Sequence, residues 1–130
     1  MPYGSALLRG SRVSKSQAPL PLRHPGPQFG AQGTRDFMGG HKGPIIGTII
    51  KPSIGLNPTE TAALVQTLVD AGIDFIKDDE LQANGPYCPF AERVEKVTRV
   101  LNSHADKTGK RVMYAFNITD EIDQMWRNLE

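Results

Sequence analysis

The chain has 130 residues, of which 38% are hydrophobic and 22% charged, and its formal net charge is +1. This length suits a single domain, and the nearly neutral charge gives no reason to expect a nucleic-acid partner. No run of about 18 apolar residues occurs, so neither a transmembrane helix nor a membrane partner is predicted. The single cysteine, Cys88, excludes an internal disulfide and favours a reducing, cytoplasmic location.

Charge is distributed unevenly along the chain. Residues 1–35 carry five basic side chains and no acidic one, whereas residues 36–130 carry all 14 acids. Such a basic start, rich in serine and proline, fits either an organelle transit peptide or a disordered segment. No amphipathic helix precedes the prolines, so we predict a disordered or unrelated N-terminus over residues 1–24. The many glycines and prolines of residues 25–44 predict an extended, turn-rich lead-in.

Short apolar runs then alternate with amphipathic segments. Residues 45–50 are apolar without polar alternation, which predicts a strand buried on both faces. A helix is expected to begin after Asn57, a good N-cap residue followed by proline, and to end near Gly72. A second strand is predicted over residues 73–76, followed by a loop over residues 81–89.

A second helix is predicted over residues 90–107, because its apolar side chains recur with a helical period. A third strand follows over residues 112–116, and a third helix begins at Asp120. Strands that alternate with helices indicate a parallel sheet with right-handed crossovers. Three such units form either an open sheet or part of a (β/α)8 barrel. A complete barrel takes about 250 residues, so a fragment is the simplest interpretation.

Charged residues follow directly on two of the predicted strands, at the edge where α/β proteins place their sites. Lys77 is followed by three carboxylates, whose mutual repulsion a hard cation such as Mg2+ relieves. Asp79 and Glu80 are candidate ligands. Lys77 is either a neutralising partner or a nucleophilic amine that takes up CO2 and becomes an anionic carbamate ligand. The alternative to a metal site is a solvated, acidic strand end without a ligand.

Two further residues end predicted strands at the same edge. Lys51 is held extended by the proline after it, and it acts either as a general base or as a surface lysine that caps the strand. Asn117 is a candidate for binding a substrate hydroxyl, although a loop cap is the simpler interpretation. Cys88 has no neighbouring histidine in the sequence and is expected to be structural.

Three segments resemble the Rubisco large-subunit superfamily. Residues 47–56, GTIIKPSIGL, resemble the family's GxxIKPKxGL segment, and residues 72–80, GIDFIKDDE, resemble its GGxDFxKDDE segment. Residues 26–32, GPQFGAQ, resemble its GPxxGIQ stretch. The resemblance covers residues 25–130 and implies an α/β fold, the first three βα units of a truncated (β/α)8 TIM barrel. Residues 45–130 would form the N-terminal part of that barrel.

The resemblance also implies roles for the strand-end residues. Lys77 corresponds to the lysine that is carbamylated by CO2 and binds Mg2+, and Asp79 and Glu80 correspond to the carboxylate ligands. Lys51 corresponds to the substrate-binding lysine that removes a proton to give an enediolate. Lys51 and Lys77 are therefore the implied catalytic residues, with Mg2+ and the activating CO2 as cofactors. A sugar-derived small-molecule substrate and a homodimer of the full-length parent are the implied partners.

The motifs depart from those of true carboxylases, which carry a second lysine where this chain has Ser53. They also carry an Asn-Val-Asn-type stretch where residues 81–84 read LQAN. Residues 85–93 resemble the corresponding loop of Rubisco-like proteins of the form IV type. We therefore predict a fragment of a Mg2+-dependent Rubisco-like enzyme that enolises a sugar-derived keto substrate. It would be an enolase or isomerase, or would act in decarboxylation or carboxyl transfer on a sugar acid, the branch it resembles most.

Two alternatives remain open at this point. The chain is a truncated product without catalytic activity, or its parent is a different barrel lyase that uses Lys77 to form a Schiff base. The three carboxyl groups beside Lys77 weigh against the Schiff base.

Overall fold

The structure, a computed structural model, describes residues 27–40 and 42–130. The predicted disordered N-terminus, residues 1–24, lies outside the described residues. The chain divides into two compact units, residues 1–33 and residues 34–130. The sheet and the candidate site lie in the second unit.

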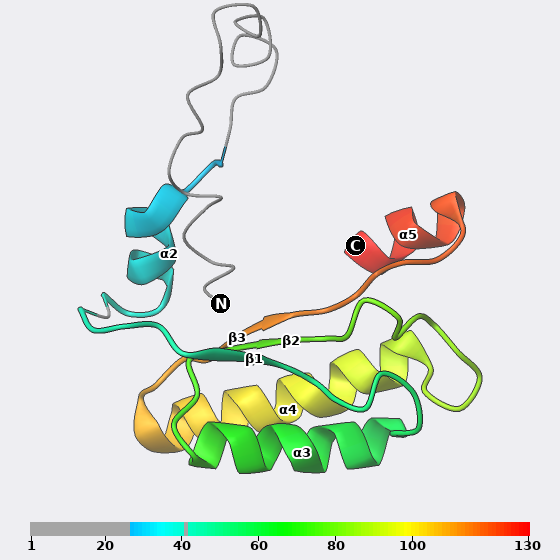
Figure 1. Ribbon diagram of the computed structural model, residues 1–130, viewed down its shortest axis with the longest axis horizontal. Helices are drawn as coiled ribbons and strands as arrows, with labels where there is room; N and C mark the ends of the chain where they lie inside the picture. Colours follow the sequence, from blue (N-terminus) through cyan, green and yellow to red (C-terminus); the bar gives the residue numbers. More distant parts are fainter. Residues whose placement is uncertain (1–26, 41) are drawn as a thin grey trace, which may run out of the picture. The chain divides into compact units, whose positions relative to one another are not determined.

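Three short parallel strands form one sheet in the order β1-β2-β3 (Figure 1). They are β1 (Gly47–Ile49), β2 (Phe75–Lys77) and β3 (Met113–Ala115). The register aligns Ile49 with Lys77 and Lys77 with Ala115, so the carboxyl ends of all three strands meet at one edge. The predicted order of strands and helices is confirmed. Each strand is shorter than predicted, although single backbone bonds continue past the strand ends: the Ile50 amide donates to the Lys77 carbonyl, and the Asp78 amide donates to the Ala115 carbonyl.

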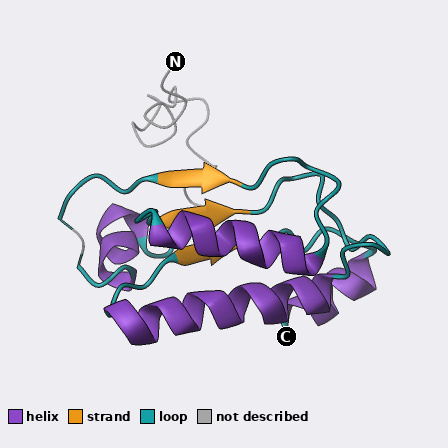
Figure 2. Ribbon diagram, turned by 90° about the horizontal axis from the view of Figure 1, so that it is seen from below, coloured by secondary structure: helices purple, strands orange, loops and turns teal. Residues whose placement is uncertain are grey.

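Two helices cover the same face of this sheet, α3 (Pro58–Asp70) and α4 (Phe90–Thr108) (Figures 1 and 2). Asn57 caps α3 as predicted, since its side chain accepts from the Thr59 and Glu60 amides while the Glu60 carboxylate accepts from the Asn57 amide. The core between sheet and helices consists of fully buried aliphatic side chains: Ile50, Val65, Val69, Ile76 and Val97. The sheet is therefore anchored through one face, and its other face carries the remaining side chains of the strands.

A helix that the sequence does not predict occupies part of the lead-in, α2 (Gly30–Phe37). The prediction of an extended lead-in was wrong over these residues, because the helix accommodates Gly30 and Gly33 and ends before the next glycines. Gly39 and Gly40 both have a φ of 77°, a left-handed conformation that suits a helix end. The Gly40 amide donates to the Arg35 carbonyl at 2.9 Å, and the Arg35 guanidinium donates to the Gly43 carbonyl at 2.7 Å.

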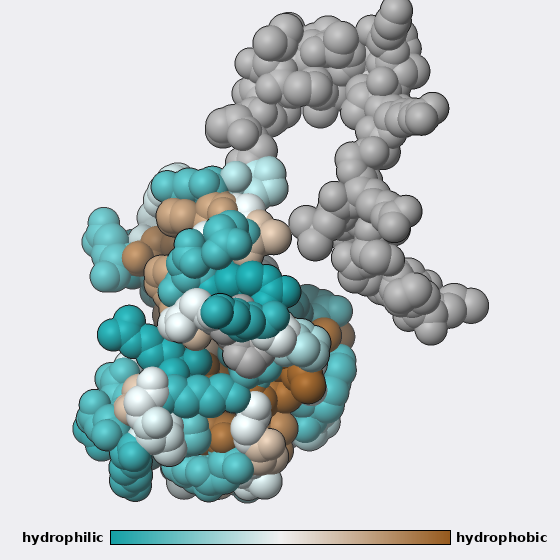
Figure 3. Space-filling model, turned by 90° about the vertical axis from the view of Figure 1, so that its left-hand side faces the viewer, coloured by the Kyte–Doolittle hydropathy of each residue, from teal (hydrophilic) through white to brown (hydrophobic). Residues whose placement is uncertain are grey.

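The last helix, α5 (Ile122–Leu129), confirms the helix predicted after Asp120. Its large apolar side chains, Ile122, Trp126 and Leu129, are each more than 60% exposed. Among the described residues, no helix combines the length and the apolar character needed to cross a bilayer. Figure 3 shows apolar surface, in brown, lying between hydrophilic groups on one face of the molecule.

Candidate functional site at the carboxyl ends of the strands

The strand register brings the predicted site residues to one edge of the sheet. Lys51, Asp79 and Asn117 each lie two residues beyond the aligned positions at the ends of β1, β2 and β3. Successive side chains of an extended segment point to opposite faces. Lys77 and Asp79 therefore project away from the helices, whereas Asp78 is buried against α4. The position of Asp78 against α4 thus separates it from Asp79 and Glu80.

Lys51 and Asp79 form an ion pair that joins the ends of β1 and β2. The Asp79 side chain is 1% exposed and the Lys51 side chain is 61% exposed. The hydrogen bond from Lys51 lowers the pKa of Asp79, and the Leu81 amide, which donates to Asp79 Oδ1 at 2.9 Å, lowers it further. The same hydrogen bond raises the pKa of Lys51. In this arrangement Lys51 is a protonated ammonium, and Asp79 is an anion.

Lys77 and Glu80 form a second ion pair beside the first. The Lys77 Nζ donates to Glu80 Oε2 at 3.0 Å and to the Asp78 carbonyl at 2.9 Å. The hydrogen bond from Lys77 lowers the pKa of Glu80, which is the more exposed partner. The edge thus carries two lysine–carboxylate pairs.

Asn117 organises the turn that carries the acids. Its Nδ2 donates to the carbonyls of Asp79, Glu80 and Gln82 at 3.0 to 3.2 Å. Its Oδ1 accepts from the amide and the hydroxyl of Thr119. The side chain therefore acts as the loop cap that the sequence offered as the simpler interpretation. The substrate-binding role of Asn117 stays a prediction.

One important residue of this region, Arg93, was missed by sequence reasoning. Arg93 lies in the first turn of α4, is 0% exposed, and donates from Nε to Asp78 Oδ2 at 3.2 Å. A signal for it existed, because Arg93 stands three residues after Phe90 and four before Val97, on the buried stripe of the helix. Cys88 is also buried, and its Sγ accepts from Gln82 Nε2 at 3.3 Å.

The residues present fit Mg2+ in their donor chemistry. Asp79 and Glu80 supply carboxylate oxygens, which hard cations prefer, and each already faces a positively charged lysine. Across the part of the chain that the structure describes, no group of three His, Cys, Asp or Glu side chains converges. Two carboxylates are thus the acidic ligands on offer at this edge, and Lys77 would add an oxygen ligand only as a carbamate.

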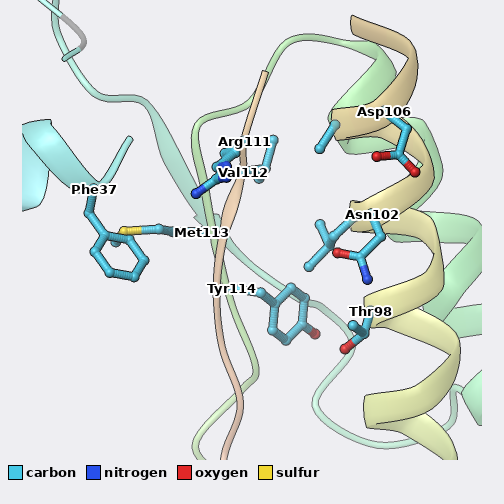
Figure 4. Close-up of a pocket in the computed structure, with 10 residues that line it drawn as sticks. Phe37, Thr98, Asn102, Asp106, Arg111, Val112, Met113 and Tyr114 are labelled. Atoms are coloured by element: carbon cyan, nitrogen blue, oxygen red, sulfur yellow. The ribbon is translucent and has the colours of Figure 1, made fainter. Parts of the chain in front are cut away.

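Two hollows border β3. One of about 200 Å³ opens at the site edge between the ends of β2 and β3, and its lining includes Lys77, Glu80 and Asn117. The other, of about 610 Å³, is lined by side chains of α4 and β3, including Asn102 and Tyr114 (Figure 4). None of the site lysines or carboxylates lines the larger hollow. The smaller one is therefore the hollow that fits the strand-end chemistry.

Comparison with known proteins identifies relatives with the same fold. The catalytic-domain model of the ribulose bisphosphate carboxylase large chain matches residues 30–130. Over 102 residues the chain is 61% identical to the 3-oxo-isoapionate-4-phosphate transcarboxylase/hydrolase of Xanthobacter autotrophicus, covering 78% of this chain and 25% of that protein. Over 129 residues it is 48% identical to the 3-oxo-isoapionate-4-phosphate decarboxylase of Rhizobium etli, covering 97% and 31%.

A solved structure agrees with these sequence matches. The crystal structure of a Rubisco-like protein from Burkholderia fungorum superposes with a TM-score of 0.74 at 50% identity, covering 78% of this chain and 25% of that chain. The predicted fold class, the first three βα units of a (β/α)8 barrel, is confirmed. The chain spans between a quarter and a third of the length of the curated relatives described above.

Proposed function

Since this chain belongs to the ribulose bisphosphate carboxylase large-chain family, we propose that it forms part of a Rubisco-like enzyme that acts on a phosphorylated 3-oxo sugar acid. The observation that carries this proposal is the pair of lysine–carboxylate contacts, Lys51 with Asp79 and Lys77 with Glu80, at one edge of the sheet. The similarity to proteins named for 3-oxo-isoapionate 4-phosphate supports the substrate class.

The proposed reaction is decarboxylation or transfer of the substrate's carboxyl group. In a 3-oxo acid, the bond between the carboxyl carbon and C2 breaks, and its electron pair moves toward the ketone oxygen to form an enolate. CO2 leaves or passes to an acceptor, and C2 takes up a proton. This reaction generates the enolate by carbon–carbon cleavage, so it needs a proton donor more than a base.

Lys51 suits the role of that donor. The contact with Asp79 raises the pKa of Lys51, and the Lys51 side chain is 61% exposed at the strand edge, where a substrate can reach it. After the proton passes to carbon, the amine regains one from solvent. In a parent that enolises its substrate by proton removal, Lys51 would first have to leave Asp79. Mg2+ bound by Asp79 would itself weaken this contact, so the choice of carboxyl loss over simple enolisation rests on the similarity to a decarboxylase and a transcarboxylase.

Asp79, Glu80 and a carbamylated Lys77 are the proposed Mg2+ ligands. When bound, the metal would supply a Lewis acid that stabilises developing negative charge on the substrate oxygen. Both carboxylates are anionic near neutral pH, because the ordinary pKa values of Asp and Glu lie at about 4. Carbamylation would replace the ammonium of Lys77 with an anion, which removes the one positive charge adjacent to these ligands on β2. A homodimer and a cytoplasmic location stay predictions for the parent protein.

The test is an assay of CO2 release by the full-length protein, with 3-oxo-isoapionate 4-phosphate and Mg2+. Lys51→Ala should lower kcat by roughly 100-fold or more, in the range that general acid catalysis contributes. Lys107→Ala, at an exposed position in the last turn of α4, is the matched control and should retain activity. Full activity in Lys51→Ala would contradict the assigned role. Borohydride trapping of substrate on Lys77 without metal would instead favour the Schiff-base alternative.

A further inference from the structure

The acid that does not face the site, Asp78, lies at the centre of a buried hydrogen-bond cluster. It is 1% exposed, and its carboxylate accepts from Arg93 Nε at 3.2 Å, the Asn117 amide at 3.0 Å and the Tyr114 hydroxyl at 2.5 Å. A buried carboxylate is tolerated only when it is paired and bonded in this way. These contacts join the ends of β2 and β3 to the first turn of α4.

Arg93 extends the cluster to the loop that precedes α4. Its Nη1 donates to the Cys88 carbonyl at 3.2 Å, and its Nη2 donates to the Asn117 carbonyl at 3.5 Å. The guanidinium carbon lies 5.4 Å from the centre of the Phe90 ring. One planar, five-donor group therefore contacts the loop after β2, the segment after β3 and its own helix.

The position of Asp78 in the sequence allows this cluster to orient the neighbouring site residues. Asp78 stands between Lys77 and Asp79, and side chains alternate across an extended segment. Anchoring Asp78 against α4 directs both neighbours to the opposite face. Asn117, whose amide bonds to Asp78, also holds the carbonyls of residues 79, 80 and 82 through its side chain.

We propose that Asp78 and Arg93 are positioning residues whose buried ion pair holds Lys77, Asp79 and Glu80 in the arrangement that binds the metal. This inference rests on the proposed function, because it assigns a purpose to the same strand edge. Asp78 and Arg93 touch neither the substrate nor the metal in this assignment. Residues that orient metal ligands through hydrogen bonds influence metal affinity strongly, and their substitution typically weakens metal binding by roughly 10–100-fold.

The chain offers a matched control at the other end of β2. Asp74 is 5% exposed, pairs with Lys110 at 2.7 Å and accepts from the Ile46 amide at 2.9 Å. Asp74→Asn and Asp78→Asn thus remove one buried negative charge each, immediately before and immediately after β2. Only Asp78 lies at the edge that carries the site.

The experiment measures Mn2+ binding by electron paramagnetic resonance on the full-length protein, with bicarbonate present. Asp78→Asn should weaken binding by roughly tenfold or more, and it should reduce the 13C NMR carbamate signal obtained with labelled bicarbonate. Asp74→Asn should lower the melting temperature by about as much as Asp78→Asn does, while its Mn2+ affinity stays unchanged. Tyr114→Phe, which removes one bond to Asp78 and keeps the aromatic ring, should weaken binding in the same direction by a smaller factor. If Asp78→Asn does not fold, the Mn2+ affinity of Tyr114→Phe tests the positioning role.

The possible failures are distinguishable. Unchanged Mn2+ affinity in Asp78→Asn or, where that variant does not fold, in Tyr114→Phe would overturn the positioning role and leave the proposed function intact. Equal losses of affinity in Asp74→Asn and Asp78→Asn would also overturn it, because the effect would then be general destabilisation. Absence of Mn2+ binding by the unsubstituted protein would overturn the proposed metal site and the positioning role together.

Discussion

At the scale of single residues, the contact between Lys51 and Asp79 decides how the site behaves in acid. Asp79 lies almost entirely out of solvent, and two hydrogen-bond donors, Lys51 and the Leu81 amide, hold its charged form. A carboxylate whose pKa is lowered on folding stabilises the folded state above its unfolded pKa. That contribution disappears when the pH falls through the lower, folded pKa.

We expect the stability difference between the unsubstituted protein and Asp79→Asn to depend on pH in this direction. The difference should be fully present above pH 3.8, the ordinary value for aspartate, and should shrink as the pH falls further. Lys51 works in the opposite sense: its raised pKa means that its share is present below pH 10.5 and lost as the pH rises beyond that value. Urea unfolding at a series of pH values measures both the acid dependence from Asp79 and the alkaline dependence from Lys51. A difference that grows toward acid would contradict the ion pair.

A second residue-scale prediction concerns the Asn117 side chain, whose amide nitrogen faces three carbonyl oxygens. Asn117→Asp would replace the donor with an oxygen that these carbonyls repel. We expect the free energy of unfolding to fall by about 2 kcal/mol, since at least one partly buried acceptor loses its bond. Asn102→Asp, at an exposed position of α4, is the control and should change stability little. Equal effects of the two substitutions would refute the role of Asn117 in the turn.

At the scale of elements, the capping box of α3 makes the clearest prediction. Asn57→Ala removes the acceptor of the Thr59 and Glu60 amides, so the free energy of unfolding should fall by about 1 kcal/mol. The denaturant slope should stay the same, because the surface exposed on unfolding does not change. Asn102→Ala, inside α4, should be neutral or slightly stabilising, since alanine favours helix interiors. A neutral Asn57→Ala would show that α3 is held by packing alone.

The elements also show how sequence reasoning succeeds and fails. The capping signal of Asn57 is local, so it was visible in the sequence and is confirmed. The helix over Gly30–Phe37 is not visible in the sequence, because a high glycine content is typical of loops, whereas here Gly39 and Gly40 terminate a helix. The predicted strands were too long, because an apolar run does not mark the residues at which a strand begins and ends.

At the scale of the whole molecule, much apolar surface lies open. Ile49 at the end of β1 is 42% exposed, and Ile122, Trp126 and Leu129 of α5 are more exposed still. Such surface on a small chain favours association. We expect the isolated 130-residue polypeptide to sediment above its monomer mass of 14.2 kDa at micromolar concentration. Trp126→Lys should reduce that association, whereas Lys107→Ala should not. A monodisperse monomer in analytical ultracentrifugation would contradict this prediction.

The sequence by itself determined the family, the alternation of strands and helices, and the identity of the lysines and acids at the strand ends. These features are local in the chain, so motif and period reveal them. Only the tertiary structure showed the partners of Asp78 and Asp79, because Asp78 bonds to Arg93, fifteen residues away, and Asp79 bonds to Lys51, which follows a different strand. The pairing of side chains across β1, β2 and β3 depends on the strand register, which no single segment encodes.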